Sequence, residues 1–109
     1  MSPEDRIRIL HMIEAAQEAI GFIGNRTIAE LEQDRKTLFA VIRCVEIIGE
    51  AAARRSQATR SAAPDIPWNA IIGMRNRLVH AYFDVDTHVV WKTVTVELPA
   101  LNRRLQALL

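Results

Sequence analysis

Apolar residues recur at every third or fourth position through most of this chain, and this spacing constrains its fold more than any other feature. The first stripe consists of Ile9, Ile13, Ala16, Ile20 and Ile23. The second consists of Leu38, Val41, Ile42, Val45, Ile48 and Ala52. Side chains at this spacing share one face of an α-helix, so each stripe predicts a helix that buries one side. Only the valine-rich "VVWKTVTVEL" at 89–98 could be a strand, and because it would have no partner strand a helix is predicted there too.

Capping residues mark where the first helices are expected to begin and end. Ser2 followed by a proline predicts the start of the first helix, where Glu4 and Asp5 suit the positive end of the helix dipole. Gly24 predicts its end. "TIAE" at 27–30 is a capping box and predicts a second, short helix.

Asp34 is the expected cap of a long helix over about 35–55. Gly49 lies on the same side of this helix as its apolar stripe, so a neighbouring helix could approach closely there. Glu46 and Glu50 share a different face, which we interpret as a solvated one.

The second half of the chain carries stronger breaking signals. Residues 56–65 are small and polar without periodicity, so they predict the longest loop. A helix restarts at Pro67 and is broken by "FDVD" at 83–86, where Asp86 is the next cap. A last helical region is expected over about 87–108, with Pro99 bending it or starting a new helix. The chain therefore reads as one all-α domain over 1–109, a bundle of four to five helices.

Composition excludes several classes of function. The formal net charge is +1, which gives no case for tight nonspecific binding to nucleic acid, although 12 of the 14 basic residues are arginine. Cys44 is the single cysteine, so no intrachain disulfide is expected, and its apolar neighbours place it in the core. His11 and His88 have no ligand spacing around them, so no metal site is expected. No signal peptide and no apolar run of about 18 residues is found, so a cytoplasmic location is expected, away from membranes.

The stretch "MRNRLVHAYFD" at 74–84 gathers more hydrogen-bonding and titratable groups than any other. On a helix Asn76 and His80 would share a face, whereas Arg75 and His80 would be roughly 140° apart. They could converge only at a cleft, at a frayed helix end or across a two-fold interface. Arginine stabilises negative charge on phosphate and histidine moves protons near neutral pH, a pair that suits metal-free RNA cleavage.

A structural role for the same residues is the open alternative. Arg75 and Arg77 could pair with acids, for which the candidates are Asp84, Asp86 and Glu50. His80 could be a core histidine with satisfied hydrogen bonds, and Tyr82 a buried ring with a bonded hydroxyl.

The order Arg75, four residues, His80, one residue, Tyr82 resembles the motif of the HepT-like branch of the HEPN superfamily. "IIGEAA" at 47–52, "IPWNAIIGMRNRLVHAYFDVD" at 66–86 and "VWKTVTVELPAL" at 90–101 also look like family segments. The resemblance covers nearly the whole chain. It implies an α-helical, HEPN-type bundle that forms a homodimer, with the motifs of two subunits facing a shared cleft.

The resemblance also implies a function. HepT-like proteins are RNase toxins of type VII toxin–antitoxin systems, and the antitoxin is a small MntA-like nucleotidyltransferase that attaches AMP to the motif tyrosine, here Tyr82. No cofactor or metal is expected for the cleavage. His80 would be the general acid or base, and Arg75 would position the phosphate. Asn76 would orient His80 or contact RNA, and Arg77 could bind the RNA backbone.

Two other functions stay open. In the first, the chain is a non-catalytic subunit that holds nucleotides or other substrates for a small nucleotidyltransferase. In the second, the motif is a packed interface of a purely structural dimer.

Overall fold

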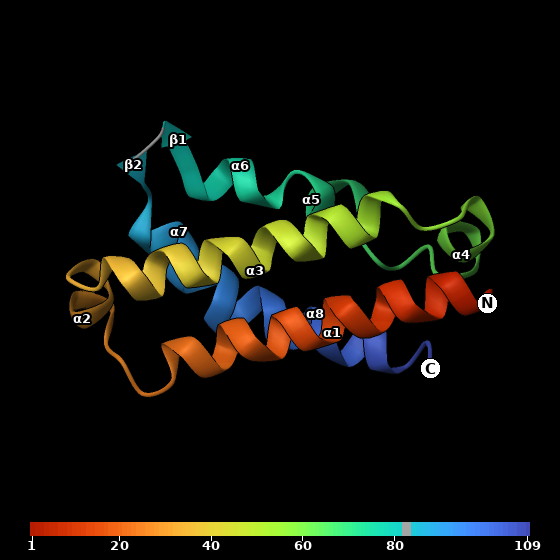
Figure 1. Cartoon of the computed structure of the whole chain (residues 1–109), viewed down its shortest axis with the longest axis horizontal. Helices are drawn as coiled ribbons and strands as arrows, with labels where there is room; N and C mark the ends of the chain where they lie inside the picture. Colours follow the sequence, from red (N-terminus) through yellow and green to blue (C-terminus); the bar gives the residue numbers. More distant parts are fainter. Residues whose placement is uncertain (82–83) are drawn as a thin grey trace.

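The computed structural model describes residues 1–81 and 84–109, and most of these residues are helical (Figure 1). The elements, in chain order, are α1 (Pro3–Ile23), α2 (Ile28–Glu32), α3 (Arg35–Ala53), α4 (Gln57–Ala62), α5 (Trp68–Ile72), α6 (Met74–Leu78), β1 (Val79–Ala81), β2 (Asp84–Val85), α7 (Thr87–Lys92), the π-helical η1 (Thr93–Glu97) and α8 (Leu98–Gln106). The predicted all-α bundle is confirmed. The described strands form only a two-stranded antiparallel sheet, β1–β2.

The two long helices, α1 and α3, form the centre of the bundle. They run antiparallel and pack side by side, with α8 and η1 against α1 and with α5 and α6 against α3 (Figure 1). Their predicted apolar stripes face this contact. The largest side chains buried almost completely are Ile9, Met12, Leu31, Ile48, Leu78, Leu98 and Leu105. Burial of each such side chain contributes about 1.5–3 kcal/mol, so apolar side chains from the long helices and from the shorter elements around them together stabilise this arrangement.

The predicted boundaries of the first three helices are confirmed. Ser2 caps α1, and Gly24 ends it with a φ of 53°, a left-handed value that glycine adopts without strain. Thr27 and Glu30 form the reciprocal capping box, with hydrogen bonds of 3.0 and 3.2 Å. Asp34 caps α3 by accepting a hydrogen bond of 3.1 Å from the backbone N–H of Thr37. These local interactions determine where each helix begins and where α1 ends.

The loop predicted over 56–65 is wrong in part, because α4 lies within it. Ser56 caps α4, and its backbone N–H donates a 3.0 Å hydrogen bond to the buried carboxylate of Asp5 at the start of α1. The hydroxyls of Ser56 and Thr59 and the guanidinium of Arg8 also donate to this carboxylate. Burial alone would raise the pKa of Asp5, but the hydrogen bonds from Ser56, Thr59 and Arg8 outweigh it and hold the pKa well below its usual range. A charged, fully bonded carboxylate therefore attaches α4 to α1.

The helical prediction for the valine-rich segment at 89–98 is confirmed, and Pro99 starts a new helix, as one of the two predicted outcomes. Before it, η1 widens to π-helical spacing, in which the N–H of Leu98 bonds to the carbonyl of Thr93, five residues earlier. Pro99 then occupies the first turn of α8, which follows η1 directly with helical backbone at Glu97 and Leu98.

Cys44 is buried, as predicted, and burial raises the pKa of its thiol. In the described parts of the chain, 1–81 and 84–109, no helix has the length and apolar character needed to cross a membrane.

Candidate active site

Gly49 brings α3 and α5 into close contact and so places α6 beside α3. A Cβ atom at Gly49 would lie 3.3 Å from the carbonyl oxygen of Ile72, so only glycine leaves this approach undisturbed. The close approach predicted from the position of Gly49 is confirmed. The chain then turns at Gly73 into α6, which carries Arg75, Asn76 and Arg77 on exposed positions.

The prediction that Asn76 and His80 share a helical face is wrong. The helix ends at Leu78, and Val79 is already extended, with φ −131° and ψ 117°. The carbonyl of Leu78 accepts a hydrogen bond of 2.8 Å from the N–H of Asp86 instead of continuing the helix. His80 consequently lies in β1, and no hydrogen bond joins it to Asn76 among the described side chains. Pairing of β1 with β2 has overridden the helical pattern.

Arg75 extends from α6 toward α3. Its Nε lies 3.6 Å from a carboxylate oxygen of Glu46, and its side chain is 45% exposed. Arg43 contacts Glu46 at 3.3 Å and Glu50 at 3.4 Å, so acids and arginines alternate along this surface. Arg75, Glu46 and Glu50 line a hollow of about 390 Å³ together with Val45, Gly49, Ala53 and Ile72. Glu46 and Glu50 thus form ion pairs at the candidate site, which the expectation of a simply solvated face did not include.

Arg77 faces a different part of the surface. Its guanidinium lies 3.9 Å from Glu97, and it lines a hollow of about 260 Å³ against α5 and α8. The predicted acidic partners of Arg75 and Arg77 are therefore wrong: their described partners are Glu46 and Glu97. Because residues two apart on a helix point in different directions, one chain does not bring both arginines to one point.

His80 is exposed, with 57% of its side chain accessible, which contradicts the core-histidine alternative. Its Nε2 lies 3.6 Å from Oδ2 of Asp86. Asp86 is also the predicted cap of α7, a role that is confirmed by a 3.2 Å hydrogen bond from the N–H of Val89 to Oδ1. The hollow that Arg75 lines does not include His80. Tyr82, the predicted modification site, lies outside the described residues.

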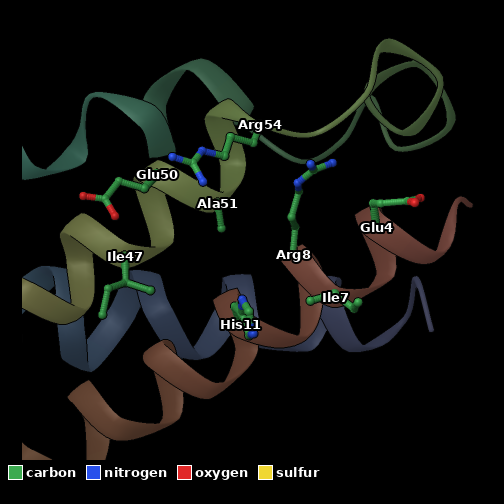
Figure 2. A pocket seen from close by; sticks show the side chains of 8 residues that line it. All are labelled: Glu4, Ile7, Arg8, His11, Ile47, Glu50, Ala51 and Arg54. Atoms are coloured by element: carbon green, nitrogen blue, oxygen red, sulfur yellow. The ribbon is translucent and has the colours of Figure 1, made fainter.

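A further hollow, of about 370 Å³, lies between α1 and α3 and was not expected from the sequence (Figure 2). Arg8 from α1 and Arg54 from α3 reach its upper edge, with His11 between the helices. The carboxylates of Glu4 and Glu50 are directed away to either side (Figure 2). Ile7, Ile47 and Ala51 complete the lining. Two elements far apart in sequence create this hollow, so no local motif could have indicated it.

Among the residues that the structure describes, no group of three or more histidine, cysteine, aspartate or glutamate side chains could hold a metal ion. Arg75 and His80 themselves offer a guanidinium cation and an exposed imidazole. Such a pair can bind an anionic group and transfer a proton to or from it.

Comparison with known proteins places this chain in a family. The family model described as "Ribonuclease HepT-like" matches residues 12–108, which include the second helical stripe, the first stripe from Ile13 onward, and both Arg75 and His80. The chain belongs to the ribonuclease HepT-like family. The HepT-like resemblance inferred from the motif is thereby confirmed.

Individual HepT-like relatives agree with this assignment. The protein named "Probable ribonuclease HepT" from Thermococcus cleftensis is 47% identical over 75 residues, which cover 69% of this chain and 68% of the relative. In Methanocaldococcus jannaschii, "Putative RNase MJ1380" is 33% identical, covering 97% of this chain and 98% of the relative. "Putative RNase MJ1216" from the same organism is also 33% identical, covering 90% and 81%. No solved structure matches the chain.

Proposed function

We propose that this chain is an endoribonuclease that cleaves RNA without a metal ion, and that Arg75 and His80 are its catalytic residues. Membership of the ribonuclease HepT-like family supports an RNase, and relatives of similar length carry RNase names. The observation that carries the residue assignment is the exposure of Arg75 and His80 on two consecutive elements, α6 and β1. A buried pair could not reach a polymeric substrate.

The roles follow from the side-chain chemistry. The guanidinium of Arg75 would bind the scissile phosphate and stabilise the charge that grows on its oxygens. His80 would act as the general base on the ribose 2′-hydroxyl or as the general acid on the leaving 5′-oxygen. Asn76, exposed on α6 beside Arg75, would contact RNA rather than orient His80. Arg77, on a different side of α6, would bind the RNA backbone away from the reacting phosphate.

A homodimer would complete the site. RNA cleavage of this kind needs both an acid and a base, whereas one chain offers a single His80. Within one chain the hollow that Arg75 lines also does not include His80. A second copy would supply the second histidine and a facing wall, and the shared cleft would lie where the two motifs meet.

We further propose that the chain is the toxin of a toxin–antitoxin pair. Its partner would be an MntA-like nucleotidyltransferase that attaches AMP to Tyr82 and silences cleavage. Tyr82 is two residues from His80 in the sequence, so a phosphate-bearing group there would compete with RNA for the same cations. Its substrate would be RNA of the cytoplasm.

The test is RNA cleavage by the purified protein with a chelator present. Arg75→Ala and His80→Ala should abolish cleavage while thermal stability and oligomeric state stay unchanged. His88→Ala and Arg103→Ala are matched controls, because these residues are also exposed on helices outside the motif, and both should cleave normally. Cleavage that survives His80→Ala would overturn the assignment.

If none of the proteins cleaves, the mass of the peptide that contains Tyr82 decides between two explanations. An added AMP would indicate a silenced nuclease. An unmodified peptide would favour the nucleotide-binding subunit over the nuclease.

A further inference from the structure

The two carboxylate oxygens of Asp86 contact two different groups. Oδ1 accepts the 3.2 Å hydrogen bond from the N–H of Val89 and so caps α7. Oδ2 lies 3.6 Å from Nε2 of His80. The cap uses only one oxygen, so it leaves the other available to the imidazole.

The backbone holds Asp86 and His80 in a fixed relation. The N–H of Asp86 donates a 2.8 Å hydrogen bond to the carbonyl of Leu78, two residues before His80. Val79 pairs with Val85 across the β1–β2 sheet, so the residues before His80 and Asp86 are also in register. Figure 1 shows that β1, β2 and the start of α7 lie together at one end of the molecule. The exposed His80 and the half-buried Asp86 therefore extend from backbone segments that are hydrogen-bonded to each other.

A carboxylate near an imidazole nitrogen determines where the imidazole proton sits. An ionised carboxylate only accepts hydrogen bonds, so the nitrogen that faces it must carry the proton. At 3.6 Å the contact is longer than a hydrogen bond, and it is an ion pair only when the imidazole is protonated. Shortening by roughly 0.6 Å would make it a hydrogen bond, and rotation of the exposed His80 side chain toward the half-buried Asp86 can supply this. Such contacts often tighten when substrate binds. No other carboxylate of the described residues lies within 4 Å of the nitrogens of His80.

We propose that Asp86 is a positioning residue that keeps the proton of His80 on Nε2 and leaves Nδ1 to exchange protons with RNA. As a base, neutral His80 would take the 2′-hydroxyl proton onto Nδ1 and keep Nε2–H toward Asp86. As an acid, the doubly protonated ring would give its Nδ1 proton to the 5′-oxygen and again keep Nε2–H. The reacting nitrogen is the same in both directions, and this assignment of Nδ1 rests on the proposed nuclease function.

The chain offers a variant that separates positioning from capping. In Asp86→Asn the amide oxygen still caps α7, because asparagine and aspartate are equally good caps. Its NH₂ group, however, can only donate to His80, so Nε2 would have to accept and the proton would move to Nδ1. Asp86→Ser keeps a capping hydroxyl but is too short to contact the ring.

The first measurement uses the ¹⁵N chemical shifts of the His80 ring at a pH where it is neutral, which report the tautomer directly. The Asp86→Ser protein gives the ratio for an unpartnered ring. The fraction of Nε2–H should be higher than this in the wild type and lower in Asp86→Asn, while His11, in α1, serves as an internal control and stays constant. Equal ratios for His80 in all three proteins would overturn the proposal.

The second measurement is steady-state RNA cleavage. Both variants should lower kcat by roughly 10- to 100-fold and leave KM for RNA unchanged, because a tautomer error impairs proton transfer rather than binding. A tautomer change with normal kcat would overturn the catalytic importance of Asp86. Absence of cleavage by the wild type would instead overturn the proposed nuclease function, and the ring shifts would still decide whether Asp86 sets the tautomer.

Discussion

Replacing Asp5 by alanine should cost this protein a large part of its stability. Four donor groups bond to the buried carboxylate, from Arg8, Ser56 and Thr59. At about 1.5–3 kcal/mol for each bond to a charged group, a simple sum would be about 6–12 kcal/mol. The true loss should be smaller, because the hydroxyls of Ser56 and Thr59 lie 3.4 Å apart and can bond to each other, while Arg8 can turn to water. We expect about 3–5 kcal/mol, as for removal of one partner from other buried ionic networks.

Urea denaturation followed by circular dichroism measures this loss. At about 2.1 cal/mol/K per residue, a loss of 3–5 kcal/mol lowers Tm by about 13–22 °C in a chain of 109 residues. Glu4→Ala is the matched control, because Glu4 occupies the same first turn of α1 but is exposed, and it should cost less than about 1 kcal/mol. A loss below about 1 kcal/mol for Asp5→Ala would refute the idea that this carboxylate attaches α4 to α1.

Three further predictions follow from buried groups. Because the pKa of Asp5 is lower in the folded protein than its value of about 3.9 in the unfolded chain, its contribution is complete above about pH 5 and is lost as the pH falls below about 4. The stability difference between the wild type and Asp5→Ala in urea should therefore shrink between pH 5 and pH 2, and a constant difference would contradict it. Gly49→Val should cost about 1–3 kcal/mol in the same assay because its Cβ would press on the carbonyl of Ile72, whereas Gly21→Val, with nothing within 4 Å of the new Cβ, should lack this steric cost. Cys44 should react with a thiol reagent at least roughly tenfold more slowly in the folded protein than in denaturant, since burial raises its pKa; equal rates would argue against that burial.

The helix boundaries could be predicted because the interactions that define them are local. The Ser2 cap and the Thr27–Glu30 box each join groups three residues apart, so the sequence displays both partners together. Asp5 and Ser56 are 51 residues apart, and no local signal links them. The small polar residues at 56–65 predicted a loop, whereas the cap formed by Ser56 and its contact with Asp5 of α1 stabilise a helix there.

The candidate site likewise combines features that the sequence predicts with features that depend on distant contacts. Its residues could be selected from one short motif, but their geometry depends on contacts across the fold. Val79 leaves the helix because it pairs with Val85, so His80 faces Asp86 rather than Asn76. The contact of Arg75 with Glu46 likewise depends on the close packing of α3 against α5 and α6.

The carboxylates beside the motif affect how strongly this surface would bind RNA. Each of Arg75, Arg77 and His80 has a carboxylate within 4 Å, from Glu46, Glu97 and Asp86. These carboxylates act as built-in counterions, so the basic groups need few ions from the solution. An RNA phosphate that binds here must displace a carboxylate of the protein from its basic partner, so each such contact gains less free energy than a contact with an unpaired arginine would. A surface of this kind would bind most RNA weakly. It would bind tightly only those strands whose shape places a phosphate in a better position against the arginine than the carboxylate occupies.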